Sequence, residues 1–178
     1  MKTRLKTRNL VLSGLFIALG YIMPFFTMQV PTFGSMLCPM HIPVLLCGFL
    51  CGAPYGAIVG FVTPLLRSVI AGMPPLYPTA LAMSLELATY GFLAGVLYKM
   101  LPKKSLFVYI DLILAMVGGR IVWGIVSSIL YGMKGNAFTL AVFLNGAFIN
   151  AIPGIIVQII LIPVIVLALQ RVNPISTD

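Results

Sequence analysis

Two arginines and two carboxylates lie inside long apolar stretches of the chain, and their chemistry needs explaining first. Glu86 stands within GMPPLYPTALAMSLELATYG (72–91), Arg67 and Arg120 lie within other apolar runs, and Asp111 lies near the start of one. Near the centre of a bilayer a charged side chain costs at least ~2.5–3.5 kcal/mol, so it normally faces a cavity or an opposite charge. Glu86 therefore either pairs with an arginine or belongs to a cavity that holds a polar ligand.

Helical spacing gathers these charges with other polar and aromatic side chains. Residues three, four or seven apart share one face of a helix, and four apolar runs each carry such a strip. The strips are Gly56, Gly60, Thr63 and Arg67; Glu86 and Tyr90; Arg120, Trp123, Ser127 and Tyr131; and Asn150, Gly154 and Gln158. Convergent polar and aromatic groups are what a small polar ligand needs. We therefore predict a binding cavity open to the outside, lined by His41, Arg67, Glu86, Tyr90, Arg120, Trp123, Asn145 and Asn150.

A simpler interpretation stays open for Glu86, namely that it pairs with Arg67 or Arg120 and only fixes the bundle. Buried charges are usually paired whatever their role. That interpretation explains less well why Trp, Tyr, His and two Asn gather at the same depth. Asp111 is interpreted as structural, because the lysine pair at 103–104 could neutralise it.

The composition sets the class of protein in which these residues act. The chain has 178 residues, of which 61% are hydrophobic and 8% charged. A soluble domain carries about 25% charged residues, so residues 1–178 are predicted to form a single integral membrane domain that binds a substrate. One histidine and three scattered cysteines give no metal-ligand spacing and no disulfide framework. Because phosphate-binding-loop, metalloprotease and serine-hydrolase motifs are absent as well, we expect neither an enzyme nor a cofactor.

The apolar runs predict an all-α bundle of six transmembrane helices. The stretch 138–170 would be about 48 Å long as one helix, too long to cross once. Its first part is therefore expected to be a loop or an interfacial helix. Five spans is the alternative, if the short second run does not cross. A span needs about 20 apolar residues, and the predicted spans are about 10–28, 41–52, 55–71, 77–99, 106–131 and a sixth beginning near 145–150.

The basic residues indicate how the bundle is oriented. With six spans, eight of the 11 Lys and Arg residues fall on one side and Lys134 alone falls on the other. Cytoplasmic loops carry an excess of Lys and Arg. Both termini are therefore predicted to be cytoplasmic, in a multi-pass protein of the cell membrane. Because membrane topology accounts for the positive charge, no nucleic acid partner is expected.

A basic N-terminus is followed by LSGLFIALGYIMPFF, HIPVLLCGFLCGAPYGAIVGFVTPLL, GMPP and ELATYGFLAGVLYK. This order resembles the substrate-binding S component of an energy-coupling factor (ECF) vitamin transporter, over nearly the whole chain. The resemblance implies six helices that bind a vitamin near the outer face of the lipid bilayer. It also implies a transmembrane coupling subunit and two cytosolic ATPases as partners, which supply the energy. A motif of small residues that contacts the coupling subunit maps onto Gly14 and Ala18, with Gly in place of the family's first Ala.

Two arginines in the cavity favour an anionic vitamin, because a guanidinium binds a carboxylate with two parallel hydrogen bonds. Pantothenate is the first choice, and pyridoxine, hydroxymethylpyrimidine, riboflavin and cobalamin stay open. A different class is also open: small membrane proteins of five or six spans serve as non-transporting scaffolds of cell-wall morphogenesis. Such a scaffold would not need a ring of polar and aromatic residues.

Overall fold

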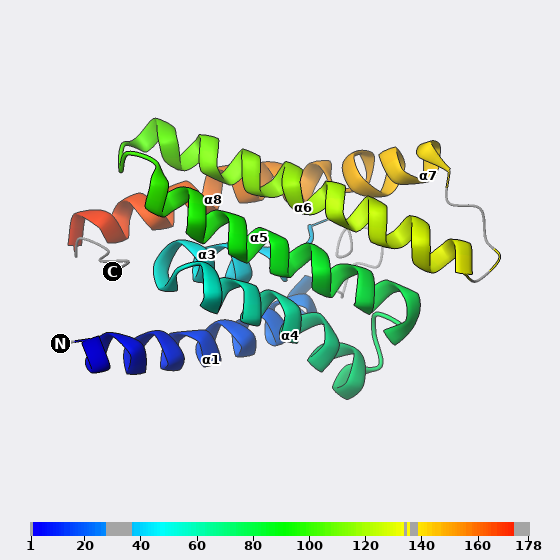
Figure 1. The fold of residues 1–178 in the computed structure, drawn as a ribbon, viewed down its shortest axis with the longest axis horizontal. Coiled ribbons are helices and arrows are strands. Elements are labelled where there is room, and N and C mark those ends of the chain that lie inside the picture. Colours follow the sequence, from blue (N-terminus) through cyan, green and yellow to red (C-terminus); the bar gives the residue numbers. More distant parts are fainter. Residues whose placement is uncertain (1, 28–36, 134, 136–138, 173–178) are drawn as a thin grey trace.

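The computed structural model describes residues 2–27, 37–133, 135 and 139–172, and every regular element in these ranges is helical (Figure 1). Helices run nearly the length of the molecule, and short π-helical turns, η1 and η2, precede two of them. In chain order the elements are α1 (Lys2–Thr27), α3 (His41–Cys51), α4 (Ala53–Ala71), η1 (Leu76–Ala80), α5 (Leu81–Met100), α6 (Ser105–Met133), α7 (Leu140–Leu144), η2 (Asn145–Ile149) and α8 (Ile152–Val172).

Within the described ranges, five helical segments are long and apolar enough to cross a membrane, so the predicted count of six is not confirmed. The second predicted span is α3, whose 11 residues rise only about 16 Å against the roughly 30 Å of a hydrocarbon core. The predicted break in 138–170 is present, because α7 and η2 precede a separate long helix. The five segments are Lys6–Phe26, Ala53–Ala71, Leu76–Met100, Ser105–Met133 and Ile152–Arg171.

Helix α3 forms the centre of the bundle, and ten of its 11 residues are buried. Its sequence HIPVLLCGFLC is apolar on all sides after the first residue, which is typical of a helix surrounded by others. It packs against α1, α4, α5 and α8. At its last residue, the carbonyl of Cys51 accepts a hydrogen bond from Asn9 Nδ2 of α1 at 3.3 Å. Helix α3 thus extends from the middle of the bundle to the end where α1 begins.

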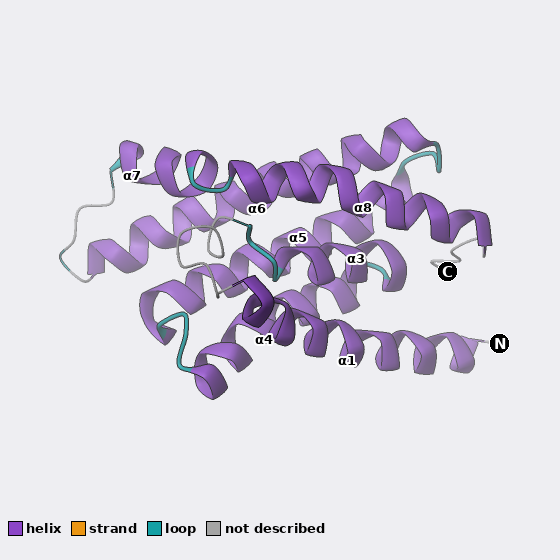
Figure 2. Cartoon of the chain, turned by 180° about the vertical axis from the view of Figure 1, so that it is seen from behind, coloured by secondary structure: helices purple, strands orange, loops and turns teal. Residues whose placement is uncertain are grey.

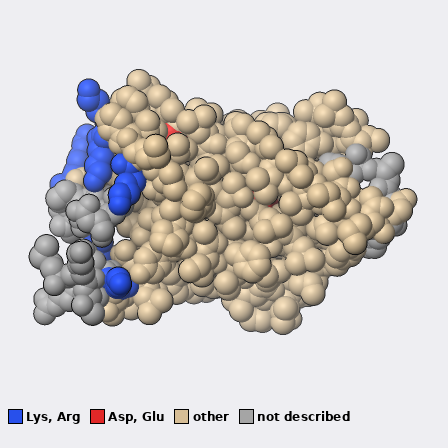
Figure 3. Space-filling view, in the orientation of Figure 1, with Lys and Arg blue, Asp and Glu red and all other residues tan. Residues whose placement is uncertain are grey.

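The beginning of α1 and the end of α8 lie at the same end of the bundle, in Figure 1 and from behind in Figure 2. Basic side chains gather at that end (Figure 3), where a hydrogen bond of 2.6 Å from Gln170 Nε2 to the Tyr98 hydroxyl ties α8 to α5. This arrangement agrees with the prediction that most of the Lys and Arg side chains lie on one side of the membrane. Lys134, the one basic residue predicted on the opposite side, lies outside the described residues.

Small residues let α4 and α5 approach each other closely. A Cβ added at Gly56 would lie 2.5 Å from the carbonyl oxygen of Gly91, and one added at Gly60 would collide with the backbone of Leu87. Only glycine permits this separation, as expected for helices that associate in lipid. Gly14 of α1 differs, because an added Cβ there would meet no atom within 4 Å. The tight α4–α5 contact fixes the position of Glu86, one residue before Leu87.

Candidate functional site

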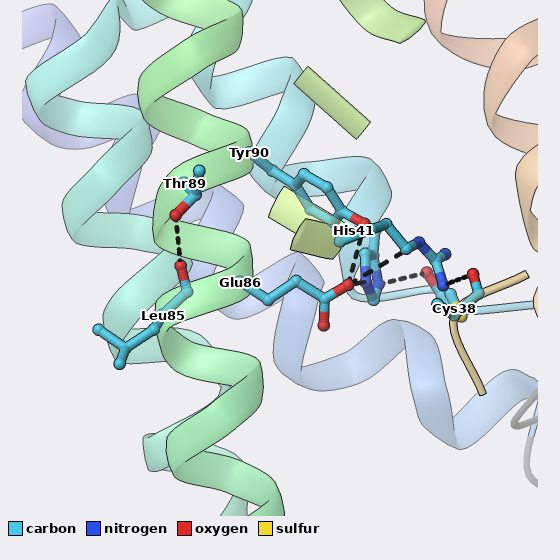
Figure 4. A network of polar contacts seen from close by, with 8 residues as sticks. Cys38, His41, Leu85, Glu86, Thr89 and Tyr90 are labelled. Atoms are coloured by element: carbon cyan, nitrogen blue, oxygen red, sulfur yellow. Dashed lines mark hydrogen bonds and ion pairs between the residues drawn. The ribbon is translucent and has the colours of Figure 1, made fainter. Parts of the chain in front are cut away.

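The carboxylate of Glu86 is the centre of a buried polar cluster near the middle of the bundle. Its side chain projects from α5 toward α3 (Figure 4), and the residue is 4% exposed. The Tyr90 hydroxyl, one turn further along α5, donates to Glu86 Oε1 at 2.9 Å. Arg120 Nε of α6 lies 3.9 Å from the same oxygen. The charge of Glu86 is therefore balanced by an arginine of the neighbouring helix.

His41 brings the beginning of α3 into the cluster. Its Nδ1 lies 3.1 Å from the carbonyl oxygen of Cys38, and its Nε2 lies 3.7 Å from Glu86 Oε1. A carbonyl oxygen only accepts hydrogen bonds, so Nδ1 carries a proton. The imidazole also packs on the Tyr90 ring, with centroids 5.2 Å apart. Both contacts hold the imidazole with Nε2 toward the carboxylate.

Cys38 belongs to the turn that precedes α3, and its backbone has φ 46°. This turn aims the carbonyl of Cys38 at His41. Burial raises the pKa of the Cys38 thiol to about 11, although the nearby Arg120 acts in the opposite direction. The thiol is therefore protonated at neutral pH and is a poor nucleophile.

Arg120 connects the cluster to the segment that precedes α8. The residue is 5% exposed, and its Nη1 donates to the backbone carbonyl of Ala147 in η2. Its Nη2 is buried and has no hydrogen-bond partner among the residues that the structure describes. A guanidinium has five N–H donors, and part of this capacity is not used by the contacts to Glu86 and Ala147.

The cluster has the chemistry of a binding site for a polar molecule. Three helices contribute side chains whose positions are fixed by packing: His41 from α3, Glu86 and Tyr90 from α5, and Arg120 from α6. The imidazole Nε2 faces Glu86, whereas the guanidinium Nη2 still has donor capacity for an acceptor on a ligand. Nowhere in the described ranges do three or more His, Cys, Asp or Glu side chains gather as they would around a metal ion.

The structure places the other four predicted site residues elsewhere. The Arg67 guanidinium is buried over the ring of Phe25 of α1, 5.8 Å from the centroid. Trp123 stacks on Phe143 of α7 with centroids 6.1 Å apart. The remaining two, on and just after η2, are the exposed Asn145 and Asn150. Helical spacing predicts which residues share a face but not how that face is rotated toward neighbouring helices.

Two members of the cluster were not predicted, because they contribute backbone carbonyl groups. Cys38 and Ala147 accept hydrogen bonds from His41 and Arg120. Every residue type carries such a carbonyl, so no sequence signal distinguishes these two positions.

The surroundings of Asp111 do not support the interpretation that the neighbouring lysines neutralise its carboxylate. The residue is 0% exposed, and neither of its carboxylate oxygens has a hydrogen-bond partner in the described part of the chain. Lys103 instead lies over the ring of Tyr98, 5.9 Å from its centroid. Asp111 is buried in the interior of the bundle, whereas both lysines of the pair at 103–104 are exposed.

Comparisons with known proteins identify the family of the chain. The family model described as "ECF transporter, substrate-specific component" matches residues 8–166. Neither the curated proteins nor the solved structures gave a match. The matched range includes all the residues of the polar cluster and all but the last six residues of α8. The chain therefore belongs to the family of substrate-specific components of ECF transporters.

Proposed function

We propose that this S component binds a water-soluble vitamin at the cluster of His41, Glu86, Tyr90 and Arg120. The observation that carries the proposal is the burial of an acid, an arginine and an imidazole together near the middle of a membrane bundle. Such groups are costly in a bilayer and mark substrate pathways or binding sites. A cluster that only stabilised the fold would have no need of a guanidinium nitrogen that lacks an acceptor among the described residues.

Pantothenate is the first candidate ligand, because its carboxylate and hydroxyl groups match these donors. Arg120 Nη2, buried without a partner in the described ranges, would bind an oxygen of the ligand. Glu86 already balances the charge of Arg120, and Arg67 lies over Phe25. The site therefore holds less excess positive charge than two arginines would supply, and pyridoxine, hydroxymethylpyrimidine, riboflavin and cobalamin stay in the test panel.

We further propose that the exposed face of α1 contacts the transmembrane coupling subunit, which works with two cytosolic ATPases. Gly14 and Ala18 are both exposed on this face, and the surroundings of Gly14 are open. Small residues there would let a partner helix approach closely. Replacing either with Leu should leave vitamin binding intact and reduce co-purification of the coupling subunit.

The experiment that tests the vitamin proposal is mass spectrometry of small molecules that co-purify with the chain, because a tight site retains its ligand. Thermal unfolding of the purified chain with each of the five vitamins provides the second measurement. The ligand should raise the midpoint as expected for binding to the native state only. A chain that retains no vitamin and is stabilised by none would favour the scaffold function.

A further inference from the structure

A strongly basic surface lies at the end of the bundle where α1 begins and α8 ends (Figure 3). The exposed basic side chains that the structure describes are Lys6, Arg8, Lys99, Lys103, Lys104 and Arg171. Both carboxylates in the described ranges, Glu86 and Asp111, are buried. Asp178 lies outside these ranges, and one more carboxylate would leave most of the cations unbalanced. The negative charge that neutralises this surface must therefore come largely from another molecule.

Tyr98 gathers several of these cations at one corner, formed by the end of α5, the connection to α6 and the end of α8. Lys103 Nζ lies over the Tyr98 ring, 5.9 Å from its centroid. The Tyr98 hydroxyl accepts a hydrogen bond of 2.6 Å from Gln170 Nε2, which places the next residue, Arg171, at the same corner. The cations of this Tyr98 corner are Lys99, Lys103, Lys104 and Arg171.

The helix dipoles account for only part of the Tyr98 corner. Lys99 and Arg171 lie in the last turns of α5 and α8, where the dipole stabilises a cation. Lys103 and Lys104 lie instead directly before α6, whose first turn has no acidic residue. The positive end of a helix dipole disfavours cations. These two lysines are therefore unfavourably placed unless an anion lies beside them.

The apolar surface beside the Tyr98 corner indicates that this anion belongs to a lipid. Met100 is 76% exposed and Leu106 is 66% exposed, one on each side of the connection between α5 and α6. Further along α6, Ile110, Ile113 and Leu114 are exposed as well. A phospholipid carries its charge and its acyl chains in the same order along the molecule. An acidic surface of a soluble protein would match the cations but not the apolar side chains next to them.

We propose that the Tyr98 corner binds the headgroup of an anionic phospholipid, whose acyl chains lie along the exposed face of α6. The headgroup bridges the end of α8 to the connection between α5 and α6. Attraction to anionic lipid is worth about fivefold in affinity for each Lys or Arg near the membrane surface. The proposal does not depend on the vitamin site, so it stands or falls separately from it.

The test measures which lipids the full-length purified chain retains. The chain is reconstituted in nanodiscs of equal parts phosphatidylcholine and phosphatidylglycerol, and native mass spectrometry counts the lipids that stay bound on release. We expect wild type to retain phosphatidylglycerol over phosphatidylcholine by at least about fivefold. Equal retention of the two lipids overturns the proposal.

Two double variants test whether the Tyr98 corner is the origin of this preference. Lys103→Gln/Lys104→Gln removes two cations from the corner, and Lys6→Gln/Arg8→Gln removes two exposed cations from α1. The preference should disappear in the first variant and persist in the second. Lys103→Arg/Lys104→Arg should keep it, because the charges are retained. Equal losses in the two Gln variants would mean that lipid responds only to the total charge, and would overturn the proposal.

Two further results complete the test. If Lys103→Gln/Lys104→Gln does not fold, Arg171→Gln replaces it, and an unchanged preference for phosphatidylglycerol in that variant overturns the proposal. If Lys103→Gln/Lys104→Gln retains phosphatidylglycerol as wild type does but no longer co-purifies with the cytosolic ATPases, the corner contacts a protein and the lipid proposal is overturned.

Discussion

The ion pair between Glu86 and Arg120 gives the sharpest prediction, because one substitution should move stability and affinity in opposite directions. Glu86→Gln keeps the shape of the side chain. It also keeps an oxygen that can accept the hydrogen bond from the Tyr90 hydroxyl, which lies 2.9 Å from Glu86 Oε1 in the wild-type chain. It removes the negative charge that lies 3.9 Å from Arg120 Nε. Arg120 is then a buried cation that has lost its counter-ion.

The magnitude follows from this distance. Two unit charges about 4 Å apart interact by about 4 kcal/mol at an effective dielectric constant of about 20. Breaking a buried ion pair from one side typically costs about 3–5 kcal/mol. We therefore expect Glu86→Gln to lower the free energy of unfolding by about 3 kcal/mol. The double variant Glu86→Gln/Arg120→Gln should recover at least half of that loss, because no uncompensated charge remains.

An anionic ligand should bind Glu86→Gln more tightly than wild type. The ligand's carboxylate replaces the missing counter-ion, and we expect a gain of at least tenfold, or about 1.4 kcal/mol. Stability is measured by denaturant unfolding of the purified chain, and affinity by calorimetric titration with pantothenate. The two single variants and the double variant form a double-mutant cycle that isolates the pairwise energy.

Two results would refute this reasoning. Purely additive stability losses in the cycle would mean that Glu86 and Arg120 are not coupled. A fall in affinity of roughly 1.5–3 kcal/mol in Glu86→Gln would mean that the carboxylate accepts a hydrogen bond from the ligand. Glu86 would then be a ligand contact and not only the partner of Arg120.

Three further predictions concern packing, thiol chemistry and orientation. Gly91→Ala should destabilise the chain by about 1–3 kcal/mol, because its methyl group collides with the backbone of α4. Gly14→Ala, which meets no atom within 4 Å, should not destabilise it, and equal losses in denaturant unfolding would contradict the close packing. In a chain whose other two cysteines are replaced by alanine, the rate of Cys38 alkylation by iodoacetamide should increase up to about pH 11. A plateau near pH 9 would show an unperturbed thiol. Lys103→Cys should react with an impermeant maleimide only after the cytoplasmic side is opened, and labelling of intact cells would reverse the orientation.

The sequence predicted which residues share a face of one helix better than it predicted which residues of different helices are in contact. The spacing of Glu86 and Tyr90 predicted a shared face, and the structure gives them a hydrogen bond. The same reasoning could not decide whether Arg67 or Arg120 lies near Glu86. That choice depends on the rotation of α4 and α6 about their axes, which the glycine contacts between α4 and α5 help to fix. Such contacts join residues far apart in the chain.

The count of spans shows a second limit of sequence reasoning. Residues 41–52 are as apolar as a membrane span, and hydropathy alone does not separate a span from a buried helix. The structure makes α3 too short to cross, and ten of its 11 residues are buried. Its position brings His41 next to Glu86. Helix α3, which was predicted to cross the membrane and does not, thus contributes His41 to the polar cluster.

A lysine could reproduce the contacts of Arg120 only in part. Arg120→Lys therefore tests whether ligand binding depends on the geometry of the guanidinium or only on its positive charge. The guanidinium of Arg120 lies near Glu86, donates to the Ala147 carbonyl and leaves Nη2 for a ligand. Lysine keeps the charge but concentrates its donors on one nitrogen, which cannot reach three separate positions as the planar guanidinium does. Arg120→Lys should therefore retain stability within about 1 kcal/mol, because a cation still opposes Glu86. Its affinity for pantothenate should fall at least tenfold in calorimetric titration. If Arg120→Lys binds pantothenate as tightly as wild type, the ligand responds to the positive charge alone, and the unused donor of Arg120 has no part in recognition.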